Sequence, residues 1–197
     1  MTLETMSLIS FWMIIPLGFL GSALHFVFDW TKHNRIAAVF GAVNESYWEH
    51  IKIAIWPVTL LQLSLFLAGG FEFPSFIPAA TIALYSIPIT MTGLVFSYKA
   101  LTKRNILWLD ISVFFVTIAL AQLIFVGMLQ QLLATSITIL LASGFLAGLL
   151  FAFFLFTFRP PKEPDLFVDP LNQKYGLSAH PDAVSNSVRV TKDSSKD

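Results

Sequence analysis

Five long apolar runs constrain this chain more than any other feature of its sequence. Each holds about 18 residues or more, enough for a helix to cross roughly 30 Å of hydrocarbon. The predicted spans are residues 8–28, 51–70, 76–98, 106–127 and 132–158. The chain is 56% hydrophobic and only 12% charged, whereas soluble domains carry about 25% charged residues. The sequence therefore predicts an all-α, polytopic transmembrane helix bundle that forms one domain over residues 1–158.

The positions of the basic residues predict how the five spans are oriented. Basic residues occur in the first loop, in the third loop and at the start of the tail, as Lys32, Arg35, Lys52, Lys99, Lys103, Arg104, Arg159 and Lys162. The second loop, around Glu72, and the fourth, around Gln130, hold none. The positive-inside rule then places the N-terminus outside and the C-terminus in the cytoplasm of a multi-pass protein of the inner cell membrane. Membrane lipids are the expected partners, and a homo-oligomer or another membrane protein stays open.

Several function classes are excluded or left without support. The formal net charge is zero and no run of five basic residues occurs, which argues against a nucleic-acid partner. The absence of cysteine excludes disulfides, thiolate zinc sites and cysteine nucleophiles. The sequence contains no G-x-S-x-G and no H-E-x-x-H motif. Whether the protein is an enzyme therefore stays open.

The composition changes after the last apolar run. Residues 159–177 contain apolar residues between prolines, including Leu166, Phe167 and Tyr175, and we expect an ordered cytoplasmic segment that packs on the bundle. Residues 178–197 are rich in Ser, Asp and Lys and are predicted to be disordered, because they cannot bury enough apolar surface to offset the entropy of ordering.

Three blocks of the sequence resemble a known family. They are HFVFDW followed by NESYWEH at 25–50, LWLD at 107–110, and PPKEPDLFVDPLNQKYG at 160–176. Together they are similar to a family of small prokaryotic integral membrane proteins described as a domain of unknown function, with NES-x-WEH and PP-x-x-P-x-LF-x-DP-x4-YG motifs. The likeness covers about residues 20–177. It implies a five-span bundle and no particular activity.

The NESYWEH stretch is predicted to start the second membrane helix. Ser46 and Glu49 have the S-x-x-E spacing of a capping box, in which Ser46 caps the helix and Glu49 accepts a hydrogen bond from the Ser46 backbone N–H. Lys52 follows Glu49 by three residues, so it lies on the same helix face and can neutralise the carboxylate. A purely structural role explains much of this motif.

Two spans carry a stripe of small and polar residues along one helix face. The stripes are Gly18, Ser22, His25 and Asp29 in the first span, and Ser86, Thr90, Gly93 and Ser97 in the third. Lipid is a poor environment for such stripes, so we expect both to face the interior of the bundle.

Ionisable residues are predicted to gather at the cytoplasmic ends of spans one, two and four. The predicted topology brings six of them to one membrane face: His25, Asp29, Glu45, Glu49, His50 and Asp110. An ionisable group within a span, as Asp110 is, costs about 2.5–3.5 kcal/mol and by default marks a functional site. We therefore expect a shared polar pocket.

Imidazoles and carboxylates are the ligands that suit Zn²⁺, Mn²⁺ or Fe²⁺, so a divalent metal is the cofactor we consider. The prediction assigns His25, Asp29 and His50 as metal ligands, and Glu45, Glu49 and Asp110 as catalytic carboxylates. Such a centre would be a metal-assisted hydrolase of a lipid ester, amide or phosphate.

Alternatives remain open at each of these residues. His25 can be a hydrogen-bonded histidine within the bundle, and Asp29 or Asp110 can pair with a nearby basic side chain. The protein would then be non-enzymatic, either a small permease or a structural, partner-binding bundle. In the latter case Gly144-x-x-x-Gly148 is a candidate packing face, against sibling helices or another chain.

Overall fold

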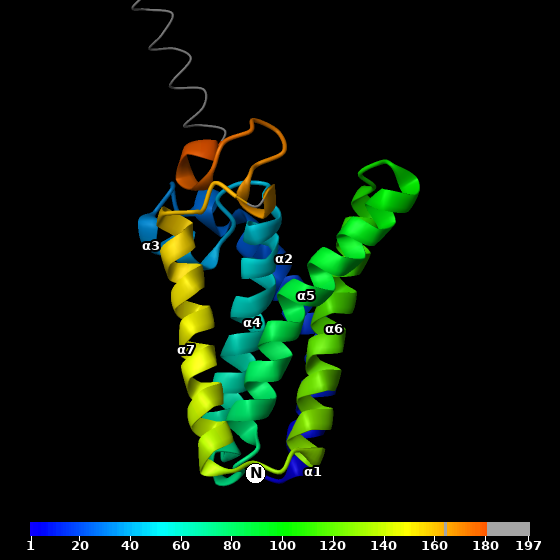
Figure 1. Cartoon of the computed structure of the whole chain (residues 1–197), viewed down its shortest axis with the longest axis vertical. Helices are drawn as coiled ribbons and strands as arrows, with labels where there is room; N and C mark the ends of the chain where they lie inside the picture. The colour runs from blue at the N-terminus through cyan, green and yellow to red at the C-terminus, as the bar shows by residue number, and fades with distance from the viewer. Residues whose placement is uncertain (164, 181–197) are drawn as a thin grey trace, which may run out of the picture.

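The computed structural model describes residues 1–163 and 165–180, and these form a helical bundle (Figure 1). The elements in chain order are α1 (Leu3–Trp12), α2 (Ile14–Trp30), α3 (Arg35–Phe40), α4 (Tyr47–Leu67), η1 (Gly70–Glu72), α5 (Phe76–Thr102), α6 (Leu107–Gln131), α7 (Ser136–Phe158), η2 (Asp165–Phe167) and η3 (Gly176–Ala179). Over the described residues there is no strand, and one isolated antiparallel bridge joins Val168 to Tyr175. The predicted all-α class is confirmed.

Four helices, α4 to α7, are each long and apolar enough to cross a membrane. A fifth crossing is possible if α1 and α2, which meet at an angle of 50°, act together as one broken span. The predicted boundaries differ from these helices by a few residues; α4, for example, begins at Tyr47 rather than at residue 51.

The apolar run predicted as the first span, residues 8–28, does not form one unbroken helix. The chain instead forms two helices that begin at Leu3 and are separated at Met13. Pro16 explains the break, because it has no N–H to donate to the carbonyl of Trp12 and its ring displaces that carbonyl. By contrast, α4 and α5 continue through Pro57 and Pro88.

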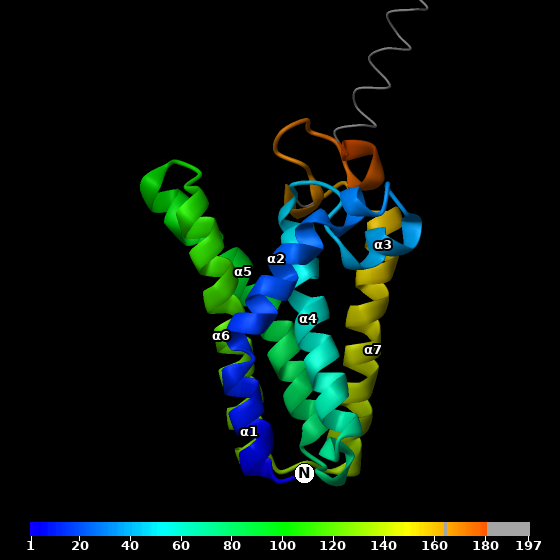
Figure 2. The same cartoon turned by 180° about the vertical axis from the view of Figure 1, so that it is seen from behind.

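The core is centred on α4, which contacts α2, α5 and α6, while α7 packs against α5 (Figures 1 and 2). Its fully buried apolar side chains come from several helices and include Ile51, Ile55, Val58, Ile87 and Ile118. The side chains of α6 and α7 that point outward are large and apolar, as expected of helices that face lipid.

The two stripes of small residues behave differently. A Cβ atom on Gly18 would lie 2.2 Å from the ring of Phe115, so the first stripe packs closely on α6. In the second stripe Gly93 and Ser97 are exposed, and a Cβ on Gly93 would meet no atom within 4 Å. Gly144 in α7 is equally open. The expectation that both stripes face the interior therefore fails for this half of α5.

One end of the bundle carries most of the charged residues that the structure describes, and we call it the tail end. It comprises the C-terminal ends of α2 and α7, α3, the start of α4, and residues 159–180 (Figures 1 and 2). The connection between α5 and α6 reaches the same level, but the hairpin leans away from the other helices.

The described residues of the C-terminal segment, 159–163 and 165–180, pack on the other parts of the tail end through apolar and polar contacts. The Trp48 ring stacks on Phe153 with ring centroids 4.2 Å apart and contacts Phe167 at 4.7 Å. The Asn44 side-chain amide donates to the Gly176 carbonyl at 3.0 Å. The described segment ends at His180, just after η3, so the prediction of disorder is wrong for residues 178–180, which form or follow this helical turn. The rest of that predicted tail, from 181 onward, lies outside the described residues.

Candidate metal-binding pocket

The NESYWEH stretch starts α4 as predicted, but by a different set of hydrogen bonds. Ser46 occupies the N-cap position without a side-chain capping bond, and its N–H donates to the Asn44 side chain at 2.8 Å. The Glu49 carboxylate accepts instead from the Val43 N–H at 2.9 Å. The predicted capping box is therefore wrong, because Glu49 turns toward the buried Lys52 and not back to Ser46.

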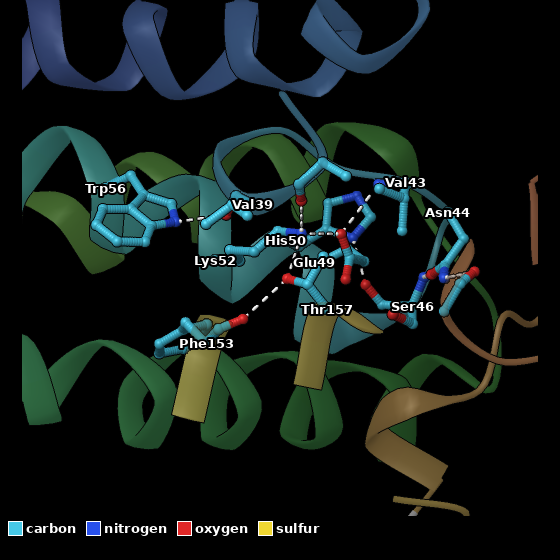
Figure 3. Close-up of polar contacts among 12 residues, drawn as sticks. Val39, Val43, Asn44, Ser46, Glu49, His50, Lys52, Trp56, Phe153 and Thr157 are labelled. Atoms are coloured by element: carbon cyan, nitrogen blue, oxygen red, sulfur yellow. Dashed lines mark hydrogen bonds and ion pairs between the residues drawn. The ribbon is translucent and has the colours of Figure 1, made fainter. Parts of the chain in front are cut away.

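Glu49 and Lys52 form a buried ion pair at the centre of the tail end (Figure 3). The Lys52 Nζ lies 2.6 Å from the Glu49 Oε2, and both side chains are almost fully inaccessible to solvent. Nζ also donates to the Ala38 carbonyl at 2.7 Å and to the Thr157 hydroxyl at 3.3 Å. The expected neutralisation of Glu49 by Lys52 is confirmed, and the Glu49 carboxylate is committed to internal contacts.

A pocket of about 910 Å³ opens beside this network. Its walls come from the last turns of α2, from residues 42–45 and from the C-terminal segment. Ionisable residues form much of the lining, namely His25, Asp29, Lys32, His33, Glu45, Asp169 and His180. Asp169 is buried and accepts hydrogen bonds from the backbone N–H groups of Glu45 and Leu171 at 3.1 and 2.7 Å, so it holds the segment in place.

Three of the lining and neighbouring residues form a first group with metal-ligand character, which we call the α2–α4 triad: His25, Glu45 and His50. The His25 Nε2 lies 3.6 Å from the Glu45 Oε1, and the His50 Nε2 lies 3.7 Å from the Glu45 Oε2. All three side chains are half-buried. Ligand atoms about 2.1 Å from a tetrahedral Zn²⁺ lie about 3.4 Å from one another. Each histidine faces a different Glu45 oxygen near this distance, and one ligand atom from each of the three residues lies within 4.8 Å of the others.

The tautomer of His50 strengthens this assignment. Its Nδ1 lies 2.9 Å from the Ser46 carbonyl oxygen, which can only accept, so Nδ1 carries the proton. The Nε2 of the same ring faces the Glu45 carboxylate, and either a metal ion or a proton on Nε2 would join these two groups. A carbonyl that fixes the ring through its other nitrogen is the usual outer-shell partner of a metal-binding histidine.

A second group lies in the same pocket, and we call it the tail triad: Asp29, His33 and His180. The Asp29 Oδ1 lies 2.8 Å from the His180 Nε2 and 3.4 Å from the His33 Nε2. The two imidazole rings are 4.4 Å apart between centroids. This triad is more exposed than the first, and it joins α2 to the C-terminal segment.

Asp110 is not part of either group. It lies in the first turn of α6, where its carboxylate accepts a hydrogen bond from the Tyr98 hydroxyl of α5. It is also absent from the pocket lining. The physical reason is the α5–α6 hairpin, whose two helices pack on each other and lean away from α2 at this level (Figure 2).

The structure thus brings together four of the six predicted site residues and separates two. His25, Glu45 and His50 share one triad, and Asp29 lies one helical turn from His25, while Glu49 and Asp110 have internal partners. Sequence reasoning missed His33 and His180. The i, i+4 spacing of Asp29 and His33 could have predicted that these two side chains lie close together. No local sequence pattern predicts that His180 joins them.

The chain matches the model of a family of unknown function, DUF6512, over residues 1–177. It belongs to the DUF6512 family. The resemblance drawn from the sequence blocks is therefore confirmed at the level of the family. No curated protein and no solved structure matches the chain. In this DUF6512 member, the side chains with metal-ligand character are those of the two triads beside the pocket.

Proposed function

We propose that this protein is a five-span inner-membrane protein that binds a divalent metal in its tail-end pocket and uses it to hydrolyse a membrane lipid. The observation that carries the proposal is the α2–α4 triad, in which two imidazole nitrogens face one carboxylate at 3.6 and 3.7 Å. Two histidines and one carboxylate are the protein ligands of many hydrolytic zinc sites, which keep a further position open for water.

The arrangement of charge supports the five-span topology. In the described part of the chain, basic residues lie in elements or connections of the tail end and of the α5–α6 tip. The opposite end, with α1, η1 and the α6–α7 connection, carries only acidic or neutral side chains. The positive-inside rule then puts the pocket on the cytoplasmic side, with α1 and α2 together as the first span.

The proposed chemistry needs few groups. His25, His50 and Glu45 would hold the divalent ion, which when bound would supply a water that ionises near neutral pH. The Glu45 carboxylate would also be the candidate base that accepts the water proton. Glu45 thus keeps the catalytic role predicted for it, whereas Glu49 supports the site from the protein interior.

The surroundings favour a lipid with an anionic headgroup. Phe26 and Trp30 stack with ring centroids 5.9 Å apart, and both are exposed on the outer face of α2 beside His25. Exposed aromatic rings at the end of a span are typical of the headgroup level of a bilayer. Lys32 lines the same pocket and provides a positive charge for a phosphate or carboxylate.

The test is metal binding coupled to lipid turnover. The full chain, purified in detergent, is stripped with EDTA and titrated with Zn²⁺, Mn²⁺ or Fe²⁺, and then incubated with a total lipid extract that is analysed by mass spectrometry. We expect tight binding by the wild type and metal-dependent release of one lipid product. His25→Ala, His50→Ala and Glu45→Gln should each lose one equivalent of metal and reduce turnover by about 100-fold or more.

The matched control for Glu45→Gln is Glu72→Gln, an exposed carboxylate of η1 at the opposite end of the bundle. It should bind metal and turn over lipid like the wild type. Unchanged metal binding in the His25→Ala and His50→Ala variants would contradict the proposed site. Metal binding without any metal-dependent lipid product would contradict the hydrolase.

A small permease is the second candidate, because the protein buries polar groups between its helices. The side-chain amides of Gln62 and Gln122 are buried and, within the described residues, have no protein hydrogen-bond partner. Buried amides of this kind usually bond to internal water, which a polar path would supply. The pocket, however, is lined only by residues of the tail end. The hydrolase is therefore the better-supported function.

A further inference from the structure

We infer that the tail triad is a second divalent-metal site, with a structural role: Asp29, His33 and His180 bind Zn²⁺ and fasten the C-terminal segment over the pocket. This inference is independent of the hydrolase, because it concerns different ligands and a different consequence. It starts from the position of the segment, which supplies part of the pocket wall through Asp169, Asn172 and His180.

The three ligand atoms are already close to one another. Both imidazole Nε2 atoms approach the same Asp29 oxygen, at 2.8 and 3.4 Å, and all three atoms lie within 4.8 Å of each other. The residues come from the end of α2, from the turn after it and from the residue that follows η3. A shared ion would therefore join two parts of the chain that are separated by 151 residues.

The backbone around His33 has an unusual conformation, and this conformation places the His33 ring beside Asp29. Lys32 and His33 have φ angles of 54° and 62°, in the left-handed region where a helix normally ends with glycine or asparagine. The His33 N–H donates to the Phe28 carbonyl at 2.9 Å and so fixes the turn. A non-glycine residue in this region is a strained choice, and strain of this kind gathers at functional sites.

The segment is already docked on apolar contacts, so an ion has a preformed site to bind. Leu177 packs against the small cluster of Phe28, Ala38 and Val43. The His180 ring also meets the Phe28 ring edge-on at 5.2 Å between centroids. In addition, the triad lies at the C-terminal end of α2, where the helix dipole favours positive charge. Because these contacts already hold the segment in place, a bound ion would stabilise its docked position further.

The experiment uses Zn²⁺ alone and the full chain in detergent. We measure the number of bound ions after equilibrium dialysis, and the rate of trypsin cleavage after Lys174, which lies in the segment between Asp169 and His180. We expect two ions for the wild type and one for His180→Ala. Saturating Zn²⁺ should slow cleavage after Lys174 at least about 10-fold in the wild type, and should have no effect on that rate in His180→Ala.

Two further variants separate this inference from the proposed function. His25→Ala should bind one ion and keep the Zn²⁺-dependent protection of Lys174, because it removes only the α2–α4 triad. Ser178→Ala is the matched control, since the exposed Ser178 hydroxyl donates only to the nearby Tyr175 carbonyl, just before η3, and this variant should behave like the wild type.

A wild type that binds one ion, lost in His180→Ala and kept in His25→Ala, would support the second site while contradicting the first. An ion count that is the same in the wild type and His180→Ala would overturn the inference. So would protection of Lys174 by Zn²⁺ in His180→Ala.

Discussion

At the scale of single residues, the buried Lys52 holds several elements of the tail end together through its polar contacts. Its ammonium has three N–H donors, and three acceptors surround it: the Glu49 carboxylate, the Ala38 carbonyl and the Thr157 hydroxyl. Glu49 in turn accepts from the Val43 N–H. One cation thus connects α3, α4, α7 and the loop before α4. Removing either charge leaves its partner buried and unpaired, which is costly.

This network predicts strong coupling between Glu49 and Lys52. Lys52→Met and Glu49→Gln are each expected to lower the free energy of unfolding by about 3–5 kcal/mol, since each leaves an uncompensated buried charge. The double variant should cost clearly less than the sum of the two. The measurement is reversible unfolding in mixed micelles of SDS and a mild detergent.

Lys162→Met, which removes an exposed positive charge, is the control and should change the unfolding free energy by no more than about 0.5 kcal/mol. Additive effects of the two buried substitutions would show that Glu49 and Lys52 act separately, contrary to the ion pair.

At the scale of elements, α2 positions His25 and Asp29 through its close approach to neighbouring helices. A Cβ atom on Gly21 would lie 2.6 Å from the Phe114 ring and 2.8 Å from the Ile53 carbonyl oxygen. Gly21 is one turn before His25, so the spacing of α2 from α4 and α6 directly sets the geometry of the α2–α4 triad. Glycine is needed here for space, not for backbone freedom.

Two glycine substitutions should therefore have opposite effects. Gly21→Ala is expected to destabilise the protein by about 1–3 kcal/mol through overpacking, and to weaken metal binding at His25. Gly144→Ala, on the open face of α7, should stabilise the helix by about 0.5–1 kcal/mol, because its Cβ meets no atom within 4 Å. Thermal unfolding in detergent measures both. A loss of stability in Gly144→Ala would show that this face is packed against another chain.

At the scale of the whole molecule, the side of the membrane on which the N-terminus lies depends on whether α1 and α2 together cross it. If α1 and α2 together cross the membrane, the N-terminus lies on the same side as η1 and opposite to the C-terminal segment. If they do not cross, the N-terminus lies on the side of the C-terminal segment. The protein contains no cysteine, so single-cysteine variants report this directly.

Glu4→Cys, Glu72→Cys and Ser178→Cys occupy three exposed positions at the two ends of the bundle. With five spans and a cytoplasmic C-terminus, a membrane-impermeant maleimide should label the cysteines at 4 and 72 in intact spheroplasts. The cysteine at 178 should react only after permeabilisation. Labelling at 178 and 4 without labelling at 72 would contradict the five-span topology.

Local patterns explain which parts of this structure were predictable. The long helices follow from apolar run length, and the Glu49–Lys52 contact follows from an i, i+3 spacing. The rule for proline is the same at Pro16, Pro57 and Pro88, so it could not indicate that only Pro16 separates two helices. Whether a proline interrupts a helix or is accommodated within it depends on the tertiary packing around it.

The candidate site was predictable only where its residues are near in sequence. Glu45 and His50 belong to one motif, and His25 and Asp29 share one helix face. His180 meets Asp29 across 151 residues, and no periodicity or spacing encodes a contact of that separation. Asp110 was misplaced because depth in the membrane does not determine which neighbour a side chain faces; Tyr98 of the same hairpin bonds to it.

The hydrogen bond between Asp29 and His180 also has a consequence for the order in which the protein is assembled during synthesis. After Asp29 has been translated, 151 more residues must be added before its histidine partner exists. All of the membrane helices are therefore synthesised, and can be inserted, while the pocket still lacks one wall. A nascent chain stalled after α7 but before residue 180 would have all its long helices and an unfinished pocket, so any metal-dependent activity would wait until His180 is translated.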